Sequence, residues 1–320
     1  MKDVAIIGLG CAAYTAAIYT ARYKLSTLII GEEEGGMGMT AAEVGNWPGD
    51  PEVRGPDLME RFKKHATSFD AVEHKVARVE KVEKISGGFR LTFQSGETAE
   101  AKTVIFATGS NKRHLGLPGE KELTGKGVSY CATCDAFFYR GKTVAVVGGG
   151  DSAVEGAAIV AQVAAKVYLI HRRDAFRAEP FWVEQVNKRD NVEFVLSNNV
   201  AEILGDARVT AVKLEKPFNG SLELKLDGIF IEVGTTPATA LPEKMGCALD
   251  EKKYLKVGAD MSTNIPGVFG AGDVTSGSNY FAQFATAAGE GSIAANSVFS
   301  YLQSDAPYEK EDGGKRVRER

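Results

Sequence analysis

Two cysteines separated by two residues, Cys131 and Cys134 in the run CATCDAFF, are the side chains in this sequence best suited to chemistry. Such a pair can form a small disulfide ring, hold half of a zinc site or consist of two inert thiols. Zinc requires four ligands, but there is no second C-x-x-C and the four histidines are scattered. We therefore predict a redox-active disulfide and no metal. Asp135 follows directly, either as a proton donor or acceptor for the dithiol or only as a helix cap.

A glycine turn of the form G-x-G-x-x-A occurs twice, each time between a short apolar run and an alanine-rich stretch. The six residues are Gly8, Gly10 and Ala13 in the first turn and Gly148, Gly150 and Ala153 in the second. The glycines let backbone N–H groups approach a pyrophosphate, and the start of the following helix supplies partial positive charge. One isolated turn is a weak signal. Two turns in the strand–helix context predict two dinucleotide-binding βαβ units, with the cysteine pair between them.

The strand that follows each turn ends in charges of opposite sign. The first ends in Glu32-Glu33, which suit hydrogen bonds from ribose hydroxyls. The second ends in His171-Arg172-Arg173, with Arg177 four residues on. Cations at this position pair with a 2′-phosphate, which predicts NADP; the alternative is a solvated basic loop. A dithiol beside two large redox cofactors indicates an electron relay from nicotinamide through flavin to the disulfide.

Composition limits the classes of protein. A chain of 320 residues, 44% hydrophobic and 25% charged, is long enough for two globular domains. The net charge of -4 gives a nucleic-acid partner no electrostatic support. No apolar run reaches about 18 residues, the N-terminus does not read as a signal peptide, and four cysteines do not make a secreted disulfide framework. We expect a soluble cytoplasmic protein that binds neither membrane nor nucleic acid.

Further elements follow from local patterns. Gly35–Asp50 is too rich in Gly and Pro for a helix and predicts a functional loop. Apolar alternation through Val76, Val79, Val82 and Phe89, Leu91, Phe93 predicts antiparallel strands. Strands ending near Gly109 and Gly272, and an amphipathic helix from Phe281 to Leu302, complete the pattern. The charged residues from about Tyr308 predict a disordered tail.

These motifs together resemble the low-molecular-weight thioredoxin reductases. The stretches that carry the resemblance are CATCDAFFYRGKTVAVVGGGDSAVE, HRRDAFRA, EVGNWPGD, IPGVFGAGDV and TAAGEG. The resemblance implies an α/β fold with two Rossmann-like domains of the three-layer ββα/βαβ type, the second inserted into the first. Residues 1–113 and 241–320 would bind FAD, and residues 114–240 would bind NADPH and carry the cysteines. It also implies a homodimer that reduces thioredoxin. The alternatives are reduction of another protein disulfide, as in a peroxide-reducing system, or a flavin- and nucleotide-binding redox sensor.

Matching the motifs residue by residue gives two implied binding sets. The FAD set is Gly8, Gly10, Ala13, Glu33, Thr40, Asn46, Thr108, Asp273 and Gln283, and the NADPH set is Gly148, Gly150, Ser152, Ala153, His171, Arg172, Arg173 and Arg177. The resemblance also places Cys134 nearer the flavin, with Cys131 as its partner and Asp135 as the acid. The sequence departs from the family pattern at Met37-Gly38, usually Gln-Leu, at Ala238, usually Asn, and at Ala282, usually Arg.

Overall fold

A computed structural model describes residues 1–304; the tail predicted from about Tyr308 lies outside the described residues. The chain divides into two units. Unit one comprises Met1–Met39, Glu43–Gly109 and the chain from Pro237 onward, and unit two comprises Thr40–Ala42 and Ser110–Thr236. None of the helices in residues 1–304 combines the length and the apolar character that a membrane crossing requires.

The sheet of unit one has a parallel part and an antiparallel part. Its strand order is β3 (Val72–Val76), β2 (Thr27–Gly31), β1 (Lys2–Ile7), β6 (Thr98–Phe106), β5 (Gly88–Phe93) and β4 (Val79–Ile85), and β17 (Val268–Gly270) pairs with the last residues of β6. Strands β3, β2, β1, β6 and β17 run parallel, whereas β6, β5 and β4 run antiparallel. The antiparallel pair expected from apolar alternation is therefore confirmed as β4 and β5. The expectation is wrong for Val76, which ends β3 and pairs in parallel with β2.

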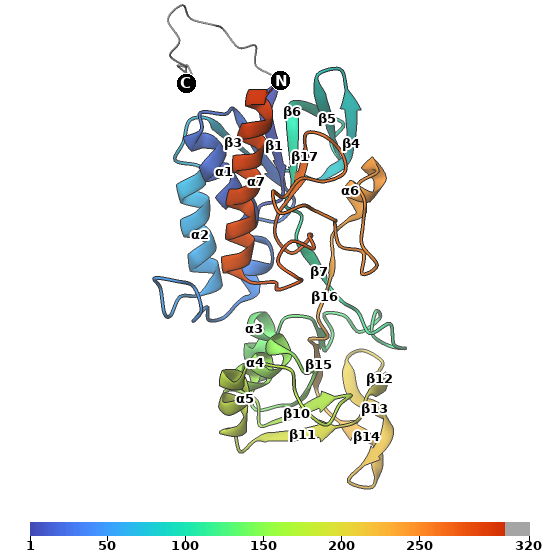
Figure 1. The fold of residues 1–320 in the computed structure, drawn as a ribbon. Helices are drawn as coiled ribbons and strands as arrows, with labels where there is room; N and C mark the ends of the chain where they lie inside the picture. Colours follow the sequence, from blue (N-terminus) through green and yellow to red (C-terminus); the bar gives the residue numbers. More distant parts are fainter. Residues whose placement is uncertain (305–320) are drawn as a thin grey trace, which may run out of the picture. The chain divides into compact units, whose positions relative to one another are not determined.

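Three helices of unit one lie side by side along its sheet (Figure 1). They are α1 (Cys11–Arg22), α2 (Gly55–Ala66) and α7 (Phe284–Ser304); the shorter elements are η1 (Gly36–Thr40) and α6 (Ala240–Met245). Successive side chains of β1 alternate between two cores: Val4 and Ile6 pack toward α1 and α7, while Ala5 and Ile7 pack with residues of β4 and β5. Because both faces of the strand are covered, it reads as a continuous apolar run.

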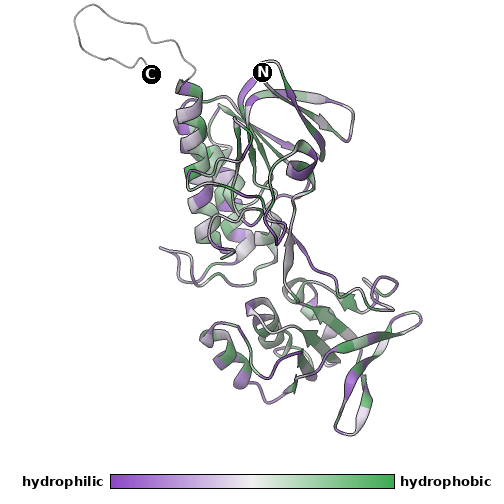
Figure 2. Ribbon diagram, turned by 45° about the vertical axis from the view of Figure 1, so that its right-hand side comes forward, coloured by the Kyte–Doolittle hydropathy of each residue, from purple (hydrophilic) through white to green (hydrophobic). Residues whose placement is uncertain are grey.

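Unit two is built on a parallel sheet of order β11 (Val192–Leu196), β10 (Lys166–His171), β9 (Thr143–Val147), β15 (Gly228–Ile231) and β8 (Val128–Ser129). One face packs on α4 (Asp151–Val160) and α5 (Pro180–Asn187), beside α3 (Ala132–Asp135) and η2 (Ala136–Tyr139). The other packs on the antiparallel strands β12 (Val200–Gly205), β13 (Val209–Phe218) and β14 (Ser221–Lys225). Strands β7 (Ser110–Lys112) and β16 (Thr235–Pro237) pair at the unit boundaries. Hydrophobic residues are concentrated on the central strands (Figure 2).

The two glycine turns have the same construction in both units. Gly8 follows β1 and Gly148 follows β9, and both have positive φ angles, +134° and +147°. A Cβ atom at Gly8 would overlap the carbonyl oxygen of Ala107, after β6, and one at Gly148 would overlap that of Glu232, after β15. These glycines are therefore required by the approach of a neighbouring strand end, whatever ligand binds. The duplication inferred from the sequence is present in the backbone.

Candidate functional site

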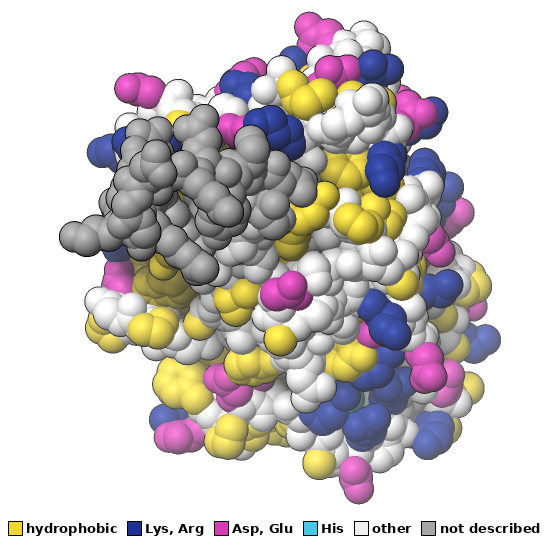
Figure 3. Space-filling model, turned by 45° about the horizontal axis from the view of Figure 1, so that its top comes forward, with side chains coloured by type: hydrophobic (Ala, Val, Ile, Leu, Met, Phe, Trp, Pro, Cys, Tyr) yellow, Lys and Arg dark blue, Asp and Glu magenta, His cyan; other side chains and the backbone are white. Residues whose placement is uncertain are grey.

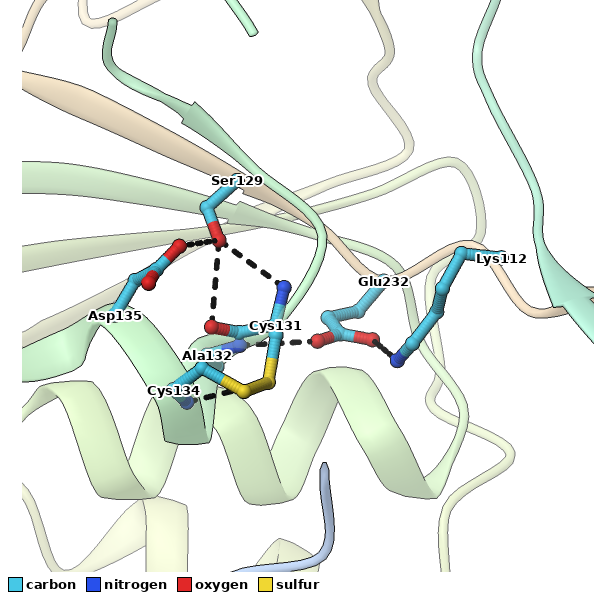
Figure 4. The surroundings of a disulfide bond; sticks show 7 residues. All are labelled: Lys112, Ser129, Cys131, Ala132, Cys134, Asp135 and Glu232. Carbon is cyan, nitrogen blue, oxygen red and sulfur yellow. Dashed lines mark hydrogen bonds and ion pairs between the residues drawn. A yellow bond between two sulfur atoms is a disulfide. The ribbon is translucent and has the colours of Figure 1, made fainter. Parts of the chain in front are cut away.

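The disulfide lies at the start of α3, directly after β8 (Figure 4). Cys131 and Cys134 are bonded, and their Cα atoms are 5.3 Å apart. Cys131 is half-buried and Cys134 is exposed. The backbone N–H of Cys134 donates a hydrogen bond to Sγ of Cys131 over 3.2 Å. The predicted C-x-x-C disulfide is thus confirmed. Cys134 is its exposed residue, and the sulfur of Cys131 accepts a backbone hydrogen bond.

Ser129 links Asp135 to the first cysteine. The Ser129 hydroxyl donates to Oδ2 of Asp135 over 2.6 Å and accepts from the backbone N–H of Cys131 over 3.1 Å. Asp135 stands at the start of η2 but makes no side-chain cap hydrogen bond there. Its side chain is therefore fixed toward the cysteine turn rather than used as a helix cap. The sequence analysis did not identify Ser129, because a lone serine at a strand end carries no signal of its own.

A buried ion pair lies on the other side of the cysteine turn. Oε1 of Glu232 accepts a hydrogen bond from the backbone N–H of Ala132 over 3.2 Å, and Oε2 lies 3.0 Å from Nζ of Lys112. The Glu232 side chain is only 6% exposed. Burial raises the pKa of the Glu232 carboxyl, and the charge and hydrogen bond of Lys112 act in the opposite direction. The sequence analysis missed both residues, although an acid at the end of the apolar run 229–231 was a usable signal.

Glu120 joins the segment before β8 to Tyr130, which directly follows β8. Its carboxylate accepts hydrogen bonds from the backbone N–H groups of Leu115, Gly116 and Leu117 and from the hydroxyl of Tyr130, which directly precedes Cys131. Burial alone would raise the pKa of Glu120, but these four donors together lower it below its usual value. The carboxylate therefore stabilises the folded unit in its ionised form.

The residues of the implied FAD set gather mainly at one edge of unit one. Gly8, Glu33, Thr108 and Asp273 follow the parallel strands β1, β2, β6 and β17, and the ends of parallel strands form one edge of a sheet. Nδ2 of Asn46 donates to Oε1 of Gln283 over 3.0 Å, so these two side chains are in contact. Ala13 is buried inside α1, Glu33 is exposed, and Thr40 belongs to unit two, so its position relative to the others is not described.

The first turn of α1 has room for an anion. Gly10 is the residue at its N-terminus, no side chain caps its N–H groups, and its first turn contains no acid. A Cβ at Gly10 would meet only the carbonyl oxygen of Gly35, at 3.9 Å. Gly150 has the same place before α4, and a Cβ there would meet nothing within 4 Å. Both helix starts leave room for the phosphate group of a nucleotide cofactor, and they differ in that α4 carries Asp151 in its first turn.

The implied NADPH set lies at the corresponding edge of unit two. Gly148, Gly150, Ser152 and Ala153 form the β9–α4 turn, and His171 ends β10. The backbone N–H of Arg177 donates to the carbonyl oxygen of Gly149 over 2.7 Å, which ties the basic segment to the turn.

The basic segment itself has a buried part and an exposed part. His171 is 6% exposed against Gly149; burial, and then the nearby arginines, lower its pKa, so it is neutral at pH 7. Within residues 1–304, none of the ion pairs involves Arg172, Arg173 or Arg177, and all three are exposed. The arginines are therefore the cations of this segment. Figure 3 shows Lys and Arg side chains gathered at the lower right of the face drawn there, whereas basic and acidic side chains are interspersed over the rest of it.

Comparison with known proteins adds the family to this geometry. Residues 2–291 match the family described as pyridine nucleotide-disulphide oxidoreductase. A thioredoxin reductase of Escherichia coli O157:H7 is 44% identical, over 93% of this chain and 95% of the relative. The crystal structure of Lactococcus lactis thioredoxin reductase superposes with a TM-score of 0.90 at 34% identity, over 95% of this chain and 100% of that chain.

This chain belongs to the thioredoxin reductase family of pyridine nucleotide-disulphide oxidoreductases. The resemblance and the fold class inferred from the sequence are confirmed. Membership implies a flavin and a nicotinamide nucleotide as cofactors. A relative from Pseudomonas fluorescens, 42% identical over 93% of this chain and 95% of its own length, bears the name glucosaminate ammonia-lyase. A family match at this level therefore leaves the reaction to be argued from the site.

The lowered pKa of Glu120 predicts a pH-dependent contribution to stability. Its ionised form is stabilising above the pKa of the unfolded chain, about 4.3, and this stabilisation is lost as the pH falls through the lower folded-state value. Glu120→Gln should lower the free energy of unfolding of unit two by about 1–3 kcal/mol at pH 7. The difference from wild type should shrink in acid. Denaturant unfolding followed by the fluorescence of Trp182 in a Trp47→Phe background measures it, with the exposed Glu122→Gln as control. An equal loss at pH 3 and pH 7 contradicts the assignment.

Proposed function

We propose that this chain is an NADPH-dependent flavoprotein that reduces the disulfide of thioredoxin through FAD and the Cys131–Cys134 pair. The observation that carries the proposal is that the bonded cysteine pair lies at the same edge of the unit-two sheet as the glycine turn after β9. The strands β8, β15, β9 and β10 are parallel, so their ends form one edge. Cys131, Gly148 and His171 lie at or just after the ends of β8, β9 and β10. An ammonia-lyase moves no electrons to a disulfide, so the cysteine pair favours a reductase over that activity.

The cysteine pair performs the last two steps of the proposed relay. The bound cofactors supply hydride and electron transfer. Two electrons break the Sγ–Sγ bond, leaving a thiolate and, with one proton, a thiol. The thiolate then attacks the partner's disulfide, and a mixed disulfide is resolved by the second cysteine, so the partner leaves reduced and the Cys131–Cys134 bond reforms. Asp135, held toward Cys131 through Ser129, is the proposed proton donor and acceptor.

Two exposed aromatic side chains support a protein as the substrate. Phe137 and Phe138 lie in η2, three and four residues after Cys134, and are 69% and 71% exposed. Large aromatic side chains left in solvent are typical of protein-binding surfaces. Their place beside the exposed Cys134 suits a partner that presents its own disulfide. A homodimer and a cytoplasmic location stay predictions, as do the limits of the FAD domain (1–113 and 241–320) and the NADPH domain (114–240).

The relay predicts that each cysteine is needed only after the flavin has been reduced. Cys134→Ser and Cys131→Ser should leave bleaching of the flavin by NADPH intact and abolish thioredoxin reduction, since a single cysteine cannot form the disulfide that accepts two electrons from the flavin. Stopped-flow absorbance follows the first step and a thioredoxin-coupled assay the second. Cys247→Ser, which alters a buried free thiol, is the control. Thioredoxin turnover at an appreciable rate in Cys134→Ser overturns the proposal.

The duplicated turns predict that equivalent substitutions remove different cofactors. Gly10 and Gly150 have φ angles of -95° and -100°, and neither has a backbone neighbour close enough to exclude a side chain. Gly10→Val should therefore keep the fold but block the pyrophosphate of FAD, whereas Gly150→Val should block NADPH and retain FAD. Flavin absorbance per protein and calorimetric NADP binding measure the two effects. Stoichiometric flavin in Gly10→Val would show that FAD lies elsewhere.

The exposed arginines predict selectivity for NADPH over NADH. A charge-assisted hydrogen bond contributes about 1.5–3 kcal/mol, so Arg172→Ala should lower kcat/KM for NADPH roughly 10- to 150-fold. The value for NADH should change little, because NADH lacks the 2′-phosphate. Arg208→Ala, which removes an exposed arginine between β12 and β13, should change neither. Equal losses with both nucleotides in Arg172→Ala reject the 2′-phosphate role.

A further inference from the structure

The ion pair of the buried Glu232 and the half-buried Lys112 contacts the cysteine turn through Ala132, and the proposed relay does not use it. Glu232 lies at the end of β15, and Lys112 lies in β7. The sequence separates Lys112 from Glu232 by 120 residues and Ala132 from Glu232 by 100, yet one carboxylate joins all three. Figure 4 shows the carboxylate between the cysteine turn and the lysine.

The equivalent position in unit one has no such group. Glu232 N–H donates to the carbonyl oxygen of Val147 in β9, as Ala107 N–H donates to that of Ile7 in β1. Both residues also place their carbonyl oxygens against the glycine of the nucleotide turn. An alanine is therefore sufficient for the backbone hydrogen bond and the glycine contact at this position. The glutamate side chain of unit two is not needed for these backbone contacts, and its carboxylate binds the cysteine turn at Ala132.

The carboxylate is bonded to the backbone of the residue that directly follows Cys131. Ala132 N–H is the donor next along the chain from Cys131, and it is bonded to Glu232 rather than free. Cys134 N–H already donates to Sγ of Cys131. A thiolate formed at Cys131 has the Cys134 N–H as a donor, and the carboxylate that holds the next residue of the turn has its charge balanced by Lys112.

We propose that Glu232 and Lys112 are positioning residues that set the redox equilibrium of the Cys131–Cys134 pair. Glu232 holds the cysteine turn through the Ala132 N–H, while Lys112 keeps the net charge of the ion pair at zero. Loss of the carboxylate charge leaves the lysine cation without its counter-ion on this side of the cysteine turn. A cation stabilises a thiolate, and stabilising the reduced form makes a dithiol–disulfide pair more oxidising.

The test is the equilibrium of the pair with reduced and oxidised dithiothreitol in the full-length holoenzyme, read by acid quenching, alkylation and mass spectrometry of the peptide that carries both cysteines. Dithiothreitol gives up two electrons and two protons as its ring closes, and the protein disulfide takes them up. Glu232→Gln keeps an oxygen for the Ala132 hydrogen bond and removes the charge. It should shift the equilibrium about tenfold toward the dithiol, which is about 30 mV for two electrons.

Three comparisons separate this role from a structural one. Glu232→Ala, which introduces the residue that unit one carries, removes the charge together with the Ala132 hydrogen bond and should shift the equilibrium at least as far. It serves as the test should Glu232→Gln not fold. Lys112→Met added to Glu232→Gln makes a neutral pair and should restore most of the wild-type value, because the unopposed cation is gone. Glu193→Gln, which breaks the Lys166–Glu193 pair of the same unit, should leave the equilibrium unchanged.

The proposal is overturned if Glu232→Gln leaves the equilibrium at the wild-type value, if the double variant is shifted as far as the single one, or if Glu193→Gln produces the same shift. It deepens the proposed disulfide chemistry of the same site. The measurement uses neither thioredoxin nor NADPH, so its failure is distinct from failure of the proposed function.

Discussion

The contact between a glycine and the end of a neighbouring parallel strand is the constraint on which both units depend. Gly8 lies against the carbonyl oxygen of Ala107 and Gly148 against that of Glu232, so closely that no Cβ atom fits. The contact fixes the direction in which the chain leaves the strand and enters the helix. The uncapped N–H groups of α1 and α4 therefore begin at the same edge of each sheet as the ends of the adjacent strands.

In unit two this constraint also fixes the cysteine turn, Cys131–Cys134. The carbonyl oxygen of Glu232 lies against Gly148 and its carboxylate binds Ala132, so one residue contacts the nucleotide turn and the cysteine turn at once. A second contact acts in the same direction: a Cβ atom at Gly156 of α4 would lie 2.9 Å from Cβ of Ala132, so α3 is seated directly on α4. The disulfide is thus held by the same strand end and helix that shape the nucleotide turn.

The sequence predicted what local patterns encode. Apolar runs, glycine spacing and the sign of the charge after each strand were enough for two βαβ units, the β4–β5 pair and the cysteine turn. Ser129, Lys112 and Glu232 could not be found in this way, because each acquires its role from a partner supplied by strand pairing. His171 shows the same limit: it is next to two exposed arginines in sequence, but contact with Gly149 buries it. The antiparallel layer β12–β14 was not anticipated either, since each of its strands buries only some of its side chains and leaves the others exposed or partly exposed.

The two units show how a duplicated backbone can serve different chemistry through a single position. After β6 the chain continues as Ala107-Thr108-Gly109, with a small side chain where the strand meets the glycine turn. After β15 it continues as Glu232-Val233-Gly234, and the larger side chain extends to the cysteine turn. A buried carboxylate is unfavourable unless it is paired and hydrogen-bonded, so this position requires both Lys112 and the Ala132 N–H. The buried carboxylate therefore depends on the cysteine turn, which supplies the Ala132 N–H. At the equivalent position of unit one no such turn is present, and the residue is Ala107.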